Sequence, residues 1–535
     1  MKKFRTACFL LIAALLCGAV CGCAADRSEV PESSSTNVQV NGIDEADIVK
    51  LLPGGYIIKL QSDGITVSKA KSGLVTVLKK NPIVDYSPRK MFVCGNVLVA
   101  IGGITRVYIY EPEDDYYYSD GWLYAAQTEI RLYDITEPES GGEDLPMLRS
   151  ILVRGDYAAS RLYLGKLYVQ TILNSEQTLG YDIKDSLTGN KKLAAYAPRG
   201  NSGDYEYRRG SDYYNGGAIL VCLNLNHYTA EYKATFYDCL IKDMYFSEQG
   251  IFFIAGYYER VWELFFLFFP RNTIYFSNYI FSADAETLQI KAVSAGLRSP
   301  NWGNAIADRF SLHAAENHLF VVTREKDRSF SVRAYGLDLK LISKLDGVAR
   351  NETLHGVTFE DGYCYFVTYR NVDPLFKVDI SDPKNIKLVG ELKIPGFSEY
   401  LKPFSCYMLG LGYTDGRQVK VSLFDISGDE PVEINNVVIV NFSYVEAINN
   451  PKAILVNEPN NIFGFSVGNS YYVFGIEDGR LSVRKKLDTD GSASSRIVRA
   501  VTISGYFYAL SDSAIESYAL PEFGFVDAFS VKINV

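Results

Sequence analysis

Cysteine and histidine are both scarce in this chain, which limits the covalent and metal chemistry that it can support. Among 535 residues there are nine cysteines and four histidines, His227, His313, His318 and His355. No two histidines have an HxH or HExxH spacing, so a zinc or copper site would need ligands from distant segments. We therefore expect most of these histidines to be structural.

Five cysteines lie beyond the N-terminal region, too few and too scattered for a disulfide framework. They are Cys94, Cys222, Cys239, Cys364 and Cys406, an odd number, mostly within apolar runs. We expect buried free thiols, although the separation of Cys222 and Cys239 permits a bridge.

The chain also lacks an excess of basic charge and a long internal apolar run. Its net charge is −9, and no basic stripe alternates with aromatic residues, which argues against nucleic-acid binding. After the N-terminal region no apolar stretch reaches the roughly 20 residues of a membrane-spanning helix. No P-loop or dinucleotide fingerprint is found either, so no cofactor is implied.

Aromatic residues, in contrast, are abundant. The chain has 39 tyrosines and 30 phenylalanines, and aromatic side chains suit the pleated surface of strands. An all-β fold is therefore expected.

The N-terminus has the pattern of an export signal, in which basic residues precede an apolar run that ends in small residues. Residues 1–22 are predicted to be a lipoprotein signal peptide, because "VCGC" resembles a bacterial lipobox with Cys23 as the lipidated residue. Ordinary cleavage near "CAA" is the alternative. Residues 23–36, rich in serine, are predicted to be a flexible tether. We expect an extracytoplasmic protein held on the bacterial cell membrane only by this lipid.

A repeated unit occupies residues 37–535. A turn precedes an alternating aromatic and β-branched strand, and further strands follow. The recurring strand is found at 54–61, 95–103, 165–173, 249–258, 317–325, 361–370, 460–468 and 504–512, and less clearly at 405–413. A later strand of the unit ends in Asp, an apolar residue and a Ser or Thr turn, as in "TEIRLYDITEPE", "PLFKVDISDPKN" and "VKVSLFDISGDE".

Units of about 50 residues with three or four strands are typical of propeller blades. Nine units can be counted with both termini included. Because most propellers have four to eight blades, we expect one large β-propeller of about eight four-stranded blades, with seven to nine open. Polar insertions are expected at 110–127 and 196–217. The apolar insertion 259–272 is predicted to pack as a helix or strand on the propeller flank, with membrane contact or a partner as alternatives.

Three segments carry a family resemblance. "NVQVNGIDEADIVK" (37–50), residues 372–404 and residues 419–439 resemble the hallmark segments of secreted proteins with a C-terminal β-propeller domain. The resemblance runs from about residue 36 to the C-terminus. It implies a propeller fold and export, and it implies no activity, because that family has no established reaction or ligand. The chain has Lys402-Pro403 where the family often has His-Pro.

The first of these segments contains three acids, Asp44, Glu45 and Asp47. Asp44 and Asp47 are candidate calcium ligands, although the spacing of a calcium loop is missing. The competing interpretation is structural: Asp44 caps a turn, Glu45 is solvated, and Asp47 begins the innermost strand of the first blade. In that interpretation "NVQV" supplies an outer strand that closes the ring against the last blade.

Ser466 and two histidines are further candidates for functional residues. Ser466 lies in "GFSVG", a nucleophile-elbow pattern, but another strand follows it and no histidine occurs after His355. Catalysis at Ser466 is not expected. His313 and His355 occupy similar places in successive units and could line one rim or channel.

The predicted function is a binding or scaffolding module for an envelope protein or glycan of unknown identity, acting as a monomer. An enzyme is the less favoured interpretation. It would be an envelope hydrolase or lyase that acts on polysaccharide or peptide with paired carboxylates at the channel.

Overall fold

The computed structural model describes the residues that follow, all within one compact unit, Glu32–Val535. The described ranges are 37–61, 63–83, 86–104, 107–110, 122–140, 142, 144–173, 182–196, 217–265, 269–298, 304–369, 373–394, 396–439 and 445–532. The predicted signal peptide 1–22, Cys23 and the tether 23–36 lie outside these ranges. So do residues 111–121 and 197–216, which make up most of the two polar insertions.

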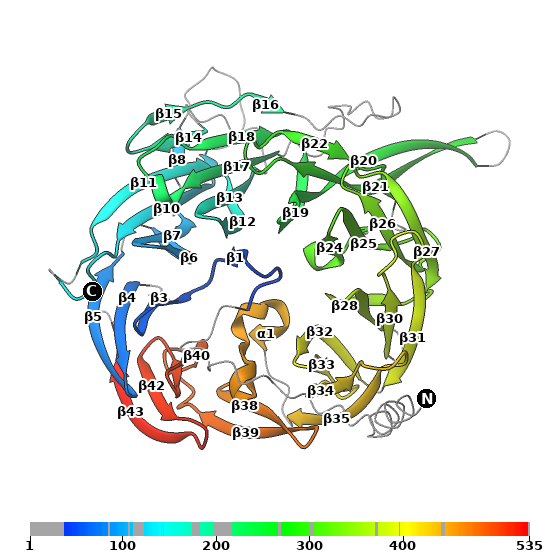
Figure 1. Cartoon of the computed structure of the whole chain (residues 1–535). Helices are drawn as coiled ribbons and strands as arrows, with labels where there is room; N and C mark the ends of the chain where they lie inside the picture. Colours follow the sequence, from blue (N-terminus) through cyan, green and yellow to red (C-terminus); the bar gives the residue numbers. More distant parts are fainter. Residues whose placement is uncertain are drawn as a thin grey trace, which may run out of the picture. The chain divides into compact units, whose positions relative to one another are not determined.

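The described residues form a β-propeller of nine blades arranged in a ring around a central channel (Figure 1). We number the blades 1 to 9 in chain order. In most blades the strands pair in sequence from the channel outwards, and neighbouring strands are antiparallel. The exceptions are β16 (Ala195–Tyr196), which pairs with β18 (Lys233–Tyr237) in parallel, and β23 (Leu297–Arg298), which pairs with β21 (Phe269–Ala283).

Among blades 1 to 4, blade 1 has four strands and the other three have additional strands. Blade 1 has β2 (Val49–Leu52), β3 (Tyr56–Gln61), β4 (Gly64–Lys71) and β5 (Leu74–Pro82). Blade 2 has β6 (Ser87–Cys94), β7 (Val97–Gly103), β10 (Gln127–Asp134), β11 (Met147–Arg154), β14 (Ile183–Asp185) and β15 (Gly189–Lys191). Blade 3 has β1 (Asp44–Glu45), β12 (Asp156–Tyr163), β13 (Lys166–Leu173), β17 (Gly217–Asn224), β18 (Lys233–Tyr237) and β16 (Ala195–Tyr196). Blade 4 has β19 (Leu240–Ser247), β20 (Gly250–Phe265), β21 (Phe269–Ala283), β22 (Ile290–Val293) and β23 (Leu297–Arg298).

Blades 5 to 9 each have four strands. Blade 5 has β24 (Leu312–Ala315), β25 (His318–Arg324), β26 (Phe330–Gly336) and β27 (Leu341–Val348). Blade 6 has β28 (Thr353–Glu360), β29 (Tyr363–Tyr369), β30 (Asp373–Asp379) and β31 (Lys387–Ile394). Blade 7 has β32 (Phe397–Phe404), β33 (Tyr407–Tyr413), β34 (Val419–Asp425) and β35 (Val432–Ile439). Blade 8 has β36 (Leu455–Asn457), β37 (Ile462–Val467), β38 (Ser470–Glu477) and β39 (Arg480–Asp488). Blade 9 has β40 (Arg499–Ile503), β41 (Tyr506–Leu510), β42 (Ala514–Ala519) and β43 (Gly524–Ser530).

The remaining elements are short. A separate hairpin pairs β8 (Val107–Tyr110) with β9 (Trp122–Ala125). The helical pieces are α1 (Glu446–Asn449), η1 (Leu225–His227), η2 (Arg309–Ser311), η3 (Pro451–Ala453) and η4 (Glu458–Asn460). Within the described ranges, no helix is long and apolar enough to span a bilayer.

The repeated strand seen in the sequence is the second strand of every blade, which confirms the predicted unit. All nine occurrences fall on such strands, from β3 in blade 1 to β41 in blade 9. These strands lie inside the sheets with other blades on both faces, so nearly all residues of β7 are buried. The outermost strand β35 instead alternates exposed and half-buried residues, because only one of its faces packs on protein.

The hydrophobic core is divided among the junctions between neighbouring blades. Nine buried clusters are found among the described residues, one for each junction of the ring. The cluster between blades 9 and 1 contains Ile57 and Val75 from blade 1 with Leu510 and Ile515 from blade 9. The ring is therefore closed by packing of the same kind as at the other junctions.

The ring has nine blades, within the expected range of seven to nine, because the first and last units are each a complete four-stranded blade. One expectation about closure differs from the structure. The prediction that "NVQV" forms an outer strand against the last blade is wrong, since residues 37–40 are not in a strand. Blades 1 and 9 exchange no strand, and Lys59 of β3 instead forms an ion pair with Asp512 of blade 9, at 2.8 Å.

The predicted Asp-containing turns are present at the ends of third strands. The carboxylates of Asp134, Asp379 and Asp425 accept hydrogen bonds from the backbone N–H two residues later, at 2.8, 2.9 and 2.9 Å respectively. Hydrogen bonds to the ionised form favour it, so the pKa of each carboxyl is lowered. These acids are turn formers in equivalent places of three blades.

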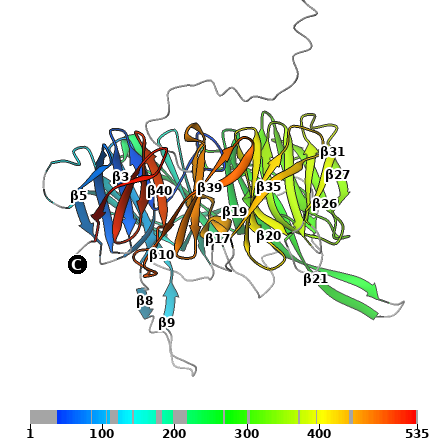
Figure 2. The ribbon, with the colours of Figure 1, turned by 90° about the horizontal axis from the view of Figure 1, so that it is seen from below.

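The described residues of the apolar insertion, 259–265 and 269–272, form strand, as one of the predicted options had it, but their backbone leads away from the ring rather than along its flank (Figure 1). They continue β20 and β21, whose pairing reaches Phe265 opposite Phe269. The long hairpin projects beyond the ring, and in Figure 2 it leaves on the same side as β8 and β9. Contact with a membrane or a partner stays a prediction for this hairpin.

All five cysteines of the propeller are free thiols. Cys222, Cys239 and Cys364 are buried, as expected, and Cys222 and Cys239 form no bridge. Cys94 is half-buried. Cys406 is exposed and lies in the turn between β32 and β33.

Candidate functional site

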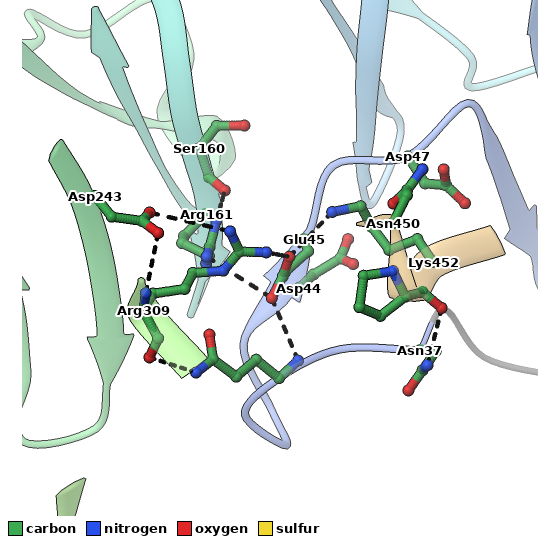
Figure 3. A network of polar contacts seen from close by, with 12 residues as sticks. Asn37, Asp44, Glu45, Asp47, Ser160, Arg161, Asp243, Arg309, Asn450 and Lys452 are labelled. Carbon is green, nitrogen blue, oxygen red and sulfur yellow. Dashed lines mark hydrogen bonds and ion pairs between the residues drawn. The ribbon is translucent and has the colours of Figure 1, made fainter. Parts of the chain in front are cut away.

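Several buried charged side chains gather in the central channel, around the first residues that the structure describes, from residue 37 onwards. Residues 37–47, which we call the crossing segment, run across the middle of the ring before entering blade 1 (Figure 1). Short pieces between blades meet the segment there: η2 contacts it through Arg309, and η3 through Pro451 and Lys452 (Figure 3). The segment thereby contacts blades that are far apart in sequence.

Backbone pairing and amide side chains hold the crossing segment in place. Its two-residue strand β1 pairs with β12, adding an inner strand to blade 3. The amide of Asn37 donates to the carbonyl of Pro451 at 2.9 Å, and that of Gln39 donates to the carbonyl of Arg309 at 2.9 Å. These two contacts reach the entrances of blades 8 and 5.

Glu45 lies at the centre of three cations. Its carboxylate is 3.1 Å from Lys452, 3.5 Å from Arg309 and 3.7 Å from Arg161, and it is only 5% exposed (Figure 3). Burial alone would raise the pKa of Glu45, but the charges of Arg161, Arg309 and Lys452 outweigh it and hold that pKa well below its ordinary value. The expectation that Glu45 is solvated is wrong, because the channel buries it between three blades.

Asp47 makes a second buried ion pair at the other end of the segment. Its carboxylate accepts from the guanidinium of Arg499 in β40, at 2.8 Å from Nη2 and 3.1 Å from Nε. Arg499 also binds Glu446 of α1 at 3.1 Å. The backbone of Asp47 forms a bridge with Met91 of blade 2. Asp47 thus precedes β2 rather than lying in it, and it connects blade 9 to blade 2.

Asp44 and Lys50 form the third pair. The Lys50 ammonium donates to the Asp44 carboxylate at 2.6 Å and to the carbonyl of Glu45 at 2.7 Å. Burial raises the pKa of Asp44, and the positive charge of Lys50 only partly opposes this rise. Asp44 therefore holds its proton more readily than an ordinary aspartate.

A cavity of about 1,030 Å³ opens beside the crossing segment. It is lined by the segment, by turns of blades 1 and 2 and by the inner strand of blade 9. Asp44 and Asp47 line it together with Lys50, Lys452 and Arg499. The lining thus combines apolar side chains with charged groups that already have partners within the chain.

The calcium hypothesis for Asp44 and Asp47 stays a prediction. Both acids lie at the same cavity, as the hypothesis requires, but each is bound by a cation of the chain. Across the described ranges, no group of three or more His, Cys, Asp or Glu side chains is placed to hold a metal ion.

His313 and His355 lie in the innermost strands of two successive blades, β24 and β28. The ring of His313 stacks on Phe359 at 4.9 Å, and burial lowers the pKa of His313. His355 Nδ1 lies 2.9 Å from the carboxylate of Glu399 in β32. Their channel-side role stays a prediction.

Ser466 lies within strand β37, as the sequence predicted. Its hydroxyl donates to the carbonyl of Ile497 at 2.5 Å, and the side chain is buried between blades 8 and 9. The serine is not at a strand-to-helix turn, which a nucleophile elbow requires.

Four cations of the channel were not predicted from the sequence as partners of the acids, namely Arg161, Arg309, Lys452 and Arg499. A signal existed for Arg499, which stands alone in the apolar stretch 497–503. A single charge in such a stretch usually has a buried partner. Nothing comparable marked Arg309 or Lys452, which lie in short connections between blades.

Known proteins similar to this chain give its family but no activity. A family model described as "Beta propeller domain" matches residues 33–523. An uncharacterized protein of Methanocaldococcus jannaschii is 25% identical over 564 residues, covering 91% of this chain and 82% of that protein. An uncharacterized protein of Archaeoglobus fulgidus is 33% identical over 215 residues, which are 40% of this chain and 33% of that protein.

Solved structures share the architecture only distantly. BamB from Moraxella catarrhalis is 13% identical, with a TM-score of 0.36, covering 67% of this chain and 93% of that chain. AztD from Citrobacter koseri is 10% identical, with a TM-score of 0.37, covering 75% and 92% respectively. Likenesses this low carry no argument about function. The match of the family model over nearly the whole propeller is decisive, and this chain belongs to the β-propeller domain family.

Proposed function

We propose that this protein is a lipid-anchored, extracytoplasmic binding or scaffolding module that catalyses no reaction. One observation carries the proposal: the acids that could act as catalysts are engaged in ion pairs that hold the crossing segment in the channel. Glu45 is surrounded by three cations and Asp47 is bound by Arg499. Carboxylates held in this way support the fold of a recognition surface rather than turnover.

The alternative is a hydrolase or lyase that acts on polysaccharide or peptide. It is favoured by the raised pKa of Asp44, which suits a general acid, and by Asp47 at the same cavity. The pairing of Asp47 with Arg499 disfavours it, because a base or nucleophile must be free to reach its substrate. Release of sugars or peptides from envelope material by the purified protein, lost in Asp44→Asn, would establish this alternative.

The test of binding is capture of partners from native envelope with the full mature protein as bait. Asn96, in an exposed turn that lines the cavity, is changed to Arg, and the control is Asn385→Arg in an exposed turn of blade 6. We expect wild type and the control to retain the same protein or glycan and Asn96→Arg to lose it. Equal capture by all three baits, or none by wild type, would contradict recognition at the cavity.

The anchor has a separate test. If Cys23 is lipidated, Cys23→Ser should move the protein from the membrane fraction to the soluble fraction. Retention of the variant on the membrane would contradict the proposed anchor. It would not affect the proposal of binding at the cavity, which the capture experiment tests separately.

A further inference from the structure

A second groove, away from the crossing segment, lies at the junction of blades 4 and 5. Its volume is about 850 Å³. One wall is the end of β22 with residues 294–298, and the other is formed by the β25–β26 turn, β26 and β27. Pockets of this size bind small molecules.

The groove is basic, although the chain as a whole is acidic. Seven Lys or Arg residues line it, against three Asp or Glu residues. The net charge of the whole chain is −9. A concave surface lined mainly by one sign of charge concentrates ligands of the opposite sign.

Each acid of the groove is already neutralised by one of its cations. Arg333 binds Glu325 at 2.7 Å, and Arg350 binds Asp327 at 2.7 Å. Lys344 binds Asp346 at 2.5 Å. These pairs fix the walls of the groove and use all three of its acids, so the groove carries an excess of positive charge.

Arg324 and Lys326 belong to this excess. Among the described residues, neither has a carboxylate within ion-pair distance. The Nε of Arg324 is buried and has no hydrogen-bond partner there. A buried guanidinium donor without an acceptor is costly, and an anionic ligand would supply the acceptor. Guanidinium groups match the planar oxygens of carboxylates and phosphates.

We infer that this groove binds a small anionic ligand that carries at least two carboxylate or phosphate groups, with Arg324 and Lys326 as its direct contacts. We propose two charged groups, one for each cation that has no carboxylate partner among the described residues, Arg324 at the end of β25 and Lys326 in the turn that follows it. The inference is independent of the proposed function, since the groove lies at another junction of the ring and needs neither the lipid nor the cavity of the channel.

The experiment is calorimetric titration of the full mature protein with two probes at low salt. Sodium triphosphate tests phosphate groups, and citrate tests carboxylates. We expect saturable binding of at least one probe, weakened about tenfold or more in the double variant Arg324→Gln, Lys326→Gln, because each lost charged contact reduces affinity. The probe that binds more tightly identifies the chemical source of the ligand's charge.

Two further proteins keep the result interpretable. Lys326 is exposed, so Lys326→Gln should fold normally and weaken binding to a smaller extent. Lys393→Gln, which removes an exposed lysine from β31 in another blade, should bind as wild type does. Failure of wild type to bind either probe, or equal binding by wild type and the double variant, would overturn the inference.

Discussion

The channel and the outer strands of the ring contain the same kinds of ion pair in opposite surroundings. In the channel, Glu45 and Lys452 are 3.1 Å apart with side chains 5% and 13% exposed. In blade 8, Glu477 and Arg484 are 2.5 Å apart with side chains 58% and 27% exposed. The shorter pair is the more solvated one.

This difference shows that distance alone does not measure what an ion pair contributes. Water screens the outer pair and solvates each partner when the pair breaks, so its net contribution is small. In the channel, loss of Glu45 leaves Arg161 and Lys452 without their counter-charge, and Arg309 with only the more distant Asp243, at 4.0 Å. The crossing segment therefore joins distant blades through contacts that cannot be removed singly without a large cost.

Replacement of Glu45 should have the largest effect. Glu45→Gln keeps the size of the side chain but removes the charge that compensates three cations, so we expect the free energy of unfolding to fall by about 3–5 kcal/mol. Urea unfolding followed by tryptophan fluorescence measures this change. A loss below about 1 kcal/mol would mean that the channel solvates these charges as the surface does.

Acid should reproduce part of that effect in the wild-type protein. The folded-state pKa of Glu45 is lowered, so its stabilisation is fully present above its ordinary pKa of about 4.3 and is lost as pH falls towards the folded-state value. The difference in unfolding free energy between wild type and Glu45→Gln should therefore shrink below about pH 4. Unfolding curves at pH 7, 4 and 3 measure it, and a constant difference would show that the cations do not lower this pKa.

Asp379 tests a turn that the sequence predicted correctly. Asp379→Ala removes hydrogen bonds from the backbone N–H and the hydroxyl of Ser381, at 2.9 and 2.6 Å. We expect a loss of about 1 kcal/mol in blade 6. Asp379→Asn keeps an acceptor and should lose less, and equal losses for the two variants in urea unfolding would assign the effect to charge instead.

The smallest effect is expected for the exposed pair in blade 8. Glu477→Gln should change the free energy of unfolding by about 0.2–1 kcal/mol, and 1 M salt should remove most of that difference. The same salt should leave the effect of Glu45→Gln largely unchanged, because buried charges are screened much less. If salt reduced the effects of both variants equally, the ion pairs of the channel and of the outer strands would not differ in how strongly water screens them.

Most of the fold was predictable because its signals are local. The second strand of each blade is an alternating aromatic and β-branched run, and the third strand often ends in an Asp turn, as at Asp134 and Asp425. Blade number was the less certain inference. The count of nine units was correct, but the sequence could not show whether the terminal units share one blade, because strand exchange depends on which edges meet in space.

The candidate site was only partly predictable. Asp44, Glu45 and Asp47 look alike in sequence, within four consecutive positions. Their surroundings differ, because β1 pairs with β12 and turns Glu45 towards cations from blade 3 and from the entrances of blades 5 and 8. No local pattern could have predicted that arrangement.

The sequence by itself determined the all-β class, the repeating blade, its turns and the position of the apolar insertion, because strand alternation and turn formation depend on neighbours within a few residues. The tertiary structure alone decided that the opening segment crosses the channel, that Glu45 and Asp47 are buried, that all three acids of the segment are paired, and that a basic groove forms between blades 4 and 5. The channel features depend on charges hundreds of residues apart, such as Asp47 and Arg499, which only ring closure brings within 2.8 Å. The groove depends on the packing of blade 4 against blade 5.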